Sequence, residues 1–187
     1  MASHEDNLRR VTEFAQSKNP VWPMAAVILD REQRVLVRAA NAWHLSPTYH
    51  PEVVALNVLA REYPAIKRDD DLVMYSSVEP CAMCVSAVHW AIVTGRPVRT
   101  IIYGAAATVL KTIWGFDAGI PSQEMSNRLG GELITIVGPE LEDECAKALA
   151  EAKALHAIID KSNPGRATLS QDVDHFYDTP AKSGSRD

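Results

Sequence analysis

Two short segments of the chain carry residues that bind transition metals. The first is His50-Pro51-Glu52, and the second contains Cys81 and Cys84. Imidazole nitrogen and thiolate sulfur are preferred zinc ligands, and a site with three protein ligands keeps a fourth tetrahedral position open for water. His50, Cys81 and Cys84 therefore indicate a catalytic metal centre rather than a structural one.

Both segments stand where a helix is expected to begin. Cys81 and Cys84 are three residues apart at the start of a predicted helix, so both thiols lie on one helix face, and the partial positive charge of a helix N-terminus favours thiolates. Pro51 suits the first position of another helix and holds His50 extended. Two helix N-termini can therefore converge on one cation. A lone pair of cysteines at this spacing could also be a redox dithiol, and the upstream His50-Pro51-Glu52 segment argues against that reading.

Glu52 is the expected catalytic acid and base. A carboxylate two positions after a metal ligand, at the same helix start, points towards the metal without having to bind it. The alternative is a surface carboxylate that only complements the positive end of the helix dipole.

The combination of these motifs, H-x-E followed by P-C-x-x-C, is the signature of zinc-dependent base deaminases. The chain resembles the cytidine deaminase superfamily over roughly Leu8–Ala157, and outside the two motifs the resemblance is one of pattern. It implies a zinc ion that activates water, with Glu52 moving protons to the ring and to the departing ammonia. Pro51 departs from the small residue that often stands between the histidine and the glutamate.

Within that superfamily the chain looks most like the bacterial guanine deaminase branch. The stretch from Trp114 to Gly119 is similar to a Gly-Phe-Asp stretch that gives those enzymes an aromatic wall and an acidic group, although Ala118 stands where a second acid is expected. Asp117 either faces the substrate or caps the loop, which would leave Ala118 at the substrate. The resemblance implies these substrate-binding residues: Asn41, Pro51, Trp114, Phe116 and Asp117.

Three further residues are assigned smaller roles in the site or in packing. His44 lies in the loop ahead of His50 and is a weaker candidate for a substrate contact. Glu79 is charged in a segment that should be buried, and we expect it to order the site through backbone hydrogen bonds rather than to take part in catalysis. Cys145 lies on the apolar stripe of the last helix and is expected to be a small buried hydrophobe.

The hydrophobic pattern predicts alternating strands and helices. Strands are predicted at Pro23–Leu29, Val35–Ala40, Leu72–Ser76, Arg99–Tyr103 and Leu133–Val137. Helices are predicted at Glu5–Ser17, Pro51–Tyr63, Cys81–Val93 and Glu140–Asp160. Thr108–Asn127 is expected to be irregular. The fold class is α/β, a three-layer α/β/α sandwich with a central mixed sheet of about five strands, as in cytidine deaminases. Residues 1–161 form the catalytic domain, and residues 162–187 form a tail, either a lid or disordered.

Composition sets the broad class of protein. The chain has 187 residues, 47% hydrophobic and 23% charged, with net charge −5. No basic stripe is present, which weighs against a nucleic-acid partner. No apolar run approaches the roughly 20 residues of a membrane span, and the first residues lack the core of a signal peptide. Three cysteines fit a reducing compartment, so we expect a cytoplasmic protein without a membrane partner.

The expected function is hydrolytic deamination of a free aminated heterocyclic base. Guanine, a modified purine and an aminotriazine are the favoured substrates, and the resemblance implies a homodimer. A cytosine or cytidine deaminase and a tRNA adenosine deaminase are the alternatives within enzymes. An alternative of another class is a deaminase-like zinc-binding scaffold without turnover, against which the intact Glu52 argues.

Overall fold

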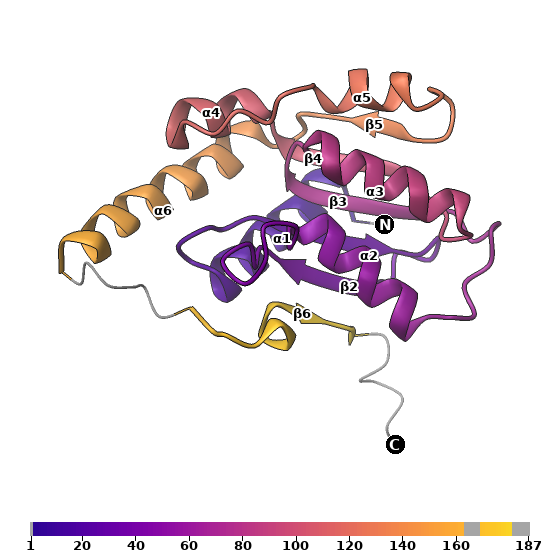
Figure 1. Ribbon diagram of the computed structural model, residues 1–187, viewed down its shortest axis with the longest axis horizontal. Helices are drawn as coiled ribbons and strands as arrows, with labels where there is room; N and C mark the ends of the chain where they lie inside the picture. Colours follow the sequence, from indigo (N-terminus) through magenta and orange to yellow (C-terminus); the bar gives the residue numbers. More distant parts are fainter. Residues whose placement is uncertain (1, 163–168, 181–187) are drawn as a thin grey trace.

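The computed structural model describes residues 2–162 and 169–180, and its centre is a mixed six-stranded sheet (Figure 1). The strands are β1 (Ala25–Leu29), β2 (Val35–Ala40), β3 (Leu72–Val78), β4 (Val98–Ala105), β5 (Thr135–Val137) and β6 (Tyr177–Asp178). Their order is β5-β4-β3-β1-β2-β6. β1 runs antiparallel to β2 and β3, whereas β3, β4 and β5 are parallel.

Helices cover both faces of this sheet. They are α1 (His4–Lys18), α2 (Pro51–Glu62), α3 (Ala82–Val93), α4 (Ala107–Trp114), α5 (Ser122–Arg128) and α6 (Glu142–Ser162). In β1, Ala26 and Ile28 face the core under α2 and α3, whereas Val27 and Leu29 face the core under α1 and α6. This alternation follows from the two-residue period of a strand. The three-layer cytidine-deaminase-like fold is therefore confirmed.

The segment predicted to be irregular contains two short helices, so that prediction was wrong. α4 has eight residues and ends at Gly115, which adopts the left-handed conformation at φ 79°. α5 has seven residues. Helices this short are marginal by themselves and show little sequence periodicity, so contacts with distant residues must stabilise them.

Part of the predicted tail packs against the domain. Phe176 is the last residue of a short 3₁₀ helix, Val173–Phe176, and is fully buried in the core beneath α1. The next two residues form β6 and pair with β2 at Arg38 and Ala39, which adds a strand to the five that were predicted. The remainder of the tail, 163–168 and 181–187, lies outside the described residues. Among the helices of the described chain, none has both the length and the apolar character that a membrane crossing requires.

Candidate metal centre and substrate cavity

His50, Cys81 and Cys84 form a compact triangle of ligand atoms. His50 Nδ1 lies 3.6 Å from Cys81 Sγ and 3.7 Å from Cys84 Sγ, and the two sulfurs are 3.5 Å apart. A tetrahedral zinc with ordinary bond lengths would hold two sulfurs about 3.8 Å apart and a nitrogen about 3.6 Å from each sulfur. The triangle thus fits a zinc ion, and it is the one such group of three potential ligands within the described residues.

The starts of α2 and α3 create this triangle. His50 precedes α2 and Cys81 precedes α3, and both residues have extended backbone, with φ near −70°. Neither side chain caps its own helix, so the imidazole and the thiol are free to face each other. Pro51 is the first residue of α2, as expected from its fixed φ. The local geometry inferred for the two motifs is therefore present in the structure.

The two thiols share their protons unequally. The contact with Cys84 and the neighbouring His50 lower the pKa of Cys81 to about 4. The contact with Cys81, together with burial, raises the pKa of the Cys84 thiol. The hydrogen bond between His50 and Cys81 raises the pKa of the His50 imidazole. Metal ligands must be deprotonated, so a bound cation would displace the protons held in this cluster.

Glu52 lies against the ligand triangle and is 5% exposed. Its Oε2 is 3.1 Å from Cys84 Sγ, and its Oε1 is 2.6 Å from the hydroxyl of Ser76, which also lies 2.7 Å from the carbonyl of Val78. Burial raises the pKa of Glu52, and the hydrogen bond from Ser76 opposes this shift. The one hydroxyl proton of Ser76 has two acceptors within reach, the Glu52 carboxylate and the Val78 carbonyl.

A cavity of about 410 Å³ opens over His50, Cys81 and Glu52, and Cys84 lies buried behind them. Its other walls are Trp22, Met24, Asn41, Trp43, Pro51, Ser76, Val78, Glu79, Ala82, Met83, Leu110, Phe116, Asp117 and Ala118. Small-molecule sites typically measure about 300–1,000 Å³ and combine apolar walls with a few polar groups. This cavity has that character, since it places the potential metal ligands beneath aromatic rings.

Four of the five predicted substrate-binding residues line this cavity, and Trp114 does not. Trp114 lies behind the wall, with its ring 4.3 Å from that of Trp22. Asn41 is almost fully buried, and its Oδ1 accepts a hydrogen bond from the backbone N–H of Trp43. His44 does not line the cavity. Its ring instead forms a hydrogen bond with the carbonyl of Ser170.

The Asp117 carboxylate is engaged within its own loop. Oδ2 forms an ion pair with the Lys111 ammonium group, 2.7 Å away. Oδ1 accepts a hydrogen bond from the backbone N–H of Gly119. The hydrogen bond from Lys111 lowers the pKa of Asp117. Asp117 therefore bonds to nearby residues as a loop cap would, and both Asp117 and Ala118 line the cavity.

Two tryptophans that sequence reasoning missed form much of the aromatic wall. Trp22 and Trp43 lie with their rings 4.9 Å apart edge to face, and each also contacts Phe116. Trp22 precedes β1 and Trp43 follows Asn41 by two residues, so both come from loops without periodicity. The one sequence signal for a place in the cavity wall was that Trp22 lies near a strand end and Trp43 lies near Asn41.

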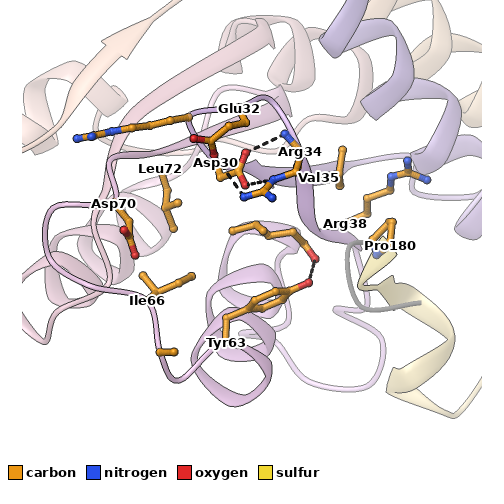
Figure 2. A pocket seen from close by; sticks show the side chains of 13 residues that line it. Asp30, Glu32, Arg34, Val35, Arg38, Tyr63, Ile66, Asp70, Leu72 and Pro180 are labelled. Atoms are coloured by element: carbon orange, nitrogen blue, oxygen red, sulfur yellow. Dashed lines mark hydrogen bonds and ion pairs between the residues drawn. The ribbon is translucent and has the colours of Figure 1, made fainter. Parts of the chain in front are cut away.

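A larger groove of about 830 Å³ lies elsewhere, between the β1–β2 turn and the end of α2 (Figure 2). Three of its charged groups bind each other, since Arg34 pairs with Asp30 and Glu32. The Tyr63 hydroxyl donates a hydrogen bond to the Leu36 carbonyl across it. The groove contains none of the potential metal ligands, so size alone does not identify the functional cavity.

Residues 1–102 match the family described as the cytidine and deoxycytidylate deaminase zinc-binding region, and the chain belongs to this family. A tRNA-specific adenosine deaminase of Rickettsia bellii is 35% identical over 97 residues, which are 50% of this chain and 62% of that enzyme. The chain thus spans less than two thirds of this relative's length. A guanine deaminase of Bacillus subtilis is 34% identical over 111 residues, 57% of this chain and 67% of that enzyme.

The fold is also that of a solved guanine deaminase. The structure from Nitrosomonas europaea matches with a TM-score of 0.68 and 25% identity, covering 82% of this chain and 86% of that one. The family match and the ligand triangle together make zinc the expected cofactor of this protein.

Proposed function

We propose that the protein is a zinc-dependent deaminase that hydrolyses the amino group of a free heterocyclic base, guanine or a guanine-like purine or aminotriazine. The observation that carries the proposal is the buried carboxylate of Glu52 beside the ligand triangle, at the floor of an aromatic cavity. A scaffold without turnover has no need of a buried acid at that position.

The residues divide the work as follows. His50, Cys81 and Cys84 would hold the zinc ion, and zinc would supply an activated water for hydrolysis. Glu52 is placed to accept a proton from water and to return protons to the ring nitrogen and to the leaving amine. The rings of Trp22, Trp43 and Phe116 enclose a planar base, and Asn41 and Pro51 complete the cavity.

The contacts that the Asp117 carboxylate makes bear on which base the cavity prefers. Because Lys111 and Gly119 each donate to one of its oxygens, part of the acceptor capacity of Asp117 is already used. Ala118 supplies an apolar surface next to it. A base with a substituted or less polar edge suits this wall better than plain guanine, because an unpaired buried polar group costs about 1–3 kcal/mol.

The test is an ammonia-release screen of free bases against nucleosides and an RNA hairpin. We expect a free purine or triazine to be turned over fastest, and Glu52→Gln protein provides the blank. Faster turnover of cytidine, of cytosine or of the RNA hairpin would favour the cytosine or tRNA adenosine alternatives, the second of which shares sequence with the Rickettsia bellii enzyme. Zinc binding without turnover of any substrate would favour the scaffold.

We also propose that residues 1–161 form the catalytic domain, onto which Phe176 and β6 pack, and that the protein is a homodimer. The outward face of α3 supports a dimer, since Trp90 is 62% exposed and Val93 is 43% exposed. Sedimentation of the wild type and of Trp90→Glu protein tests this. A monomeric wild type would contradict the proposal, and a dimer that persists in the variant would move the interface away from α3.

A further inference from the structure

One carboxylate joins the metal site to the cavity wall. Glu79 directly follows β3 and stands two residues before Cys81. Its Oε2 accepts a 3.0 Å hydrogen bond from the backbone N–H of Ala107, and its Oε1 accepts 2.9 Å bonds from both the backbone N–H and the hydroxyl of Ser122. These partners lie 28 and 43 residues further along the chain.

Ala107 and Ser122 are the first residues of α4 and α5. The first N–H groups of a helix have no partner within the helix, and an anionic acceptor there is favourable because the helix dipole is positive at that end. The residues at the two N-cap positions, Ala106 and Pro121, provide no side-chain cap. Glu79 therefore caps both helices from outside, which helps to explain how such short helices form.

The chain between the two caps is the cavity wall. Phe116, Asp117 and Ala118 lie between α4 and α5, and all three line the cavity. Glu79 fixes the helix on each side of that wall to the strand end that leads into Cys81. Since three donors already bind its two oxygens, Glu79 has less capacity to bind a substrate than to hold the wall.

We propose that Glu79 is a positioning residue for substrate recognition: it sets the position of the wall at 116–118 relative to the metal ligands. This inference rests on the proposed deaminase function for its kinetic consequences. It concerns the wall and leaves the roles of zinc and of Glu52 unchanged. The expected signature is weakened binding of the base with little change in the chemical step.

The test is Glu79→Gln in the full-length zinc-loaded protein, assayed with the base that the wild type turns over fastest. Glutamine keeps one acceptor but points an N–H group at a backbone N–H, so α4 or α5 loses its cap. We expect KM to rise about tenfold, equivalent to about 1.4 kcal/mol. We expect kcat to stay within about threefold and zinc to remain at about one per chain, because the ligand triangle is untouched.

Hydrogen exchange of residues 107–122 gives a readout that is independent of turnover, and it should speed up in Glu79→Gln. The control is Glu124→Gln, a carboxylate on the exposed side of α5 that pairs with Arg128. We expect neither its KM nor its exchange to change. Ser122→Ala is a milder second variant, which removes only the hydroxyl bond and should raise KM by about threefold.

The outcomes separate this inference from the proposed function. Unchanged KM and unchanged exchange in Glu79→Gln would overturn it, as would loss of zinc or a large fall in kcat with KM preserved. If Glu79→Gln does not fold, unchanged KM and exchange in Ser122→Ala would overturn it. A wild type that deaminates none of the bases would refute the proposed function, and faster exchange in Glu79→Gln would still support the link between Glu79 and the wall.

Discussion

Replacing Glu52 by glutamine separates proton transfer from metal binding. The amide has nearly the same shape as the carboxyl group, and its oxygen can still accept the hydrogen bond from Ser76. The substitution therefore keeps the packing around a residue that is 5% exposed, while it removes the group that takes and returns protons.

The magnitudes follow from that environment. General acid–base catalysis by a positioned side chain is typically worth about 10²- to 10⁴-fold, so kcat should fall by that factor, or about 3–5 kcal/mol in the barrier. The free energy of unfolding should change by less than about 1 kcal/mol, because a neutral amide is cheaper to bury than an ionisable carboxyl group. At this chain length that corresponds to about 4 °C or less in Tm.

Three measurements on one preparation check this prediction: ammonia release at saturating base, zinc per chain by atomic absorption, and Tm by calorimetry. Glu62→Gln, at the far end of the same helix, is the matched control and should behave as the wild type. Loss of zinc together with activity in Glu52→Gln would show that Glu52 is a metal ligand. Retention of full turnover would refute its role as acid and base.

Three further predictions follow from other contacts. Phe176→Ala should lower the free energy of unfolding by about 3–5 kcal/mol, measured by urea denaturation, because a fully buried aromatic ring leaves a cavity; unchanged stability would contradict the packing of 169–180. Asp117→Ala and Lys111→Met both remove one ion pair, so the double variant should raise KM no more than Asp117→Ala alone, which also loses the bond from Gly119. Additive effects would indicate that Asp117 binds the substrate directly. Cys84→Ser should reduce zinc content well below one per chain, and full retention of zinc would contradict its assignment as a ligand.

The metal centre could be predicted from the sequence because its geometry is mostly local. Two cysteines three residues apart at a helix start share one face, and a proline after His50 sets the start of a second helix. Five strands could also be placed, since each is an apolar or alternating run between turn residues. In these segments local backbone preference and the hydrophobic pattern favour the same structure.

The cavity wall depended on contacts between residues far apart in the chain. The Asp117 carboxylate is held by an ion pair with Lys111, and the helices on either side of the wall are capped by Glu79 from 28 and 43 residues away. Trp22 and Trp43 come from loops whose positions no periodic pattern determines. Helices of seven and eight residues have too little propensity to form without such partners.

The sequence by itself determined the candidate ligand set, the acid beside it and the order of five strands and four helices. Only the tertiary structure decided which rings line the cavity, and that a two-residue strand after Phe176 completes the sheet. The physical reason is the range of the forces involved. Helix starts and strand periodicity depend on residues that are neighbours in the sequence. Caps, ion pairs and ring contacts between distant segments form only once the core has brought those segments together.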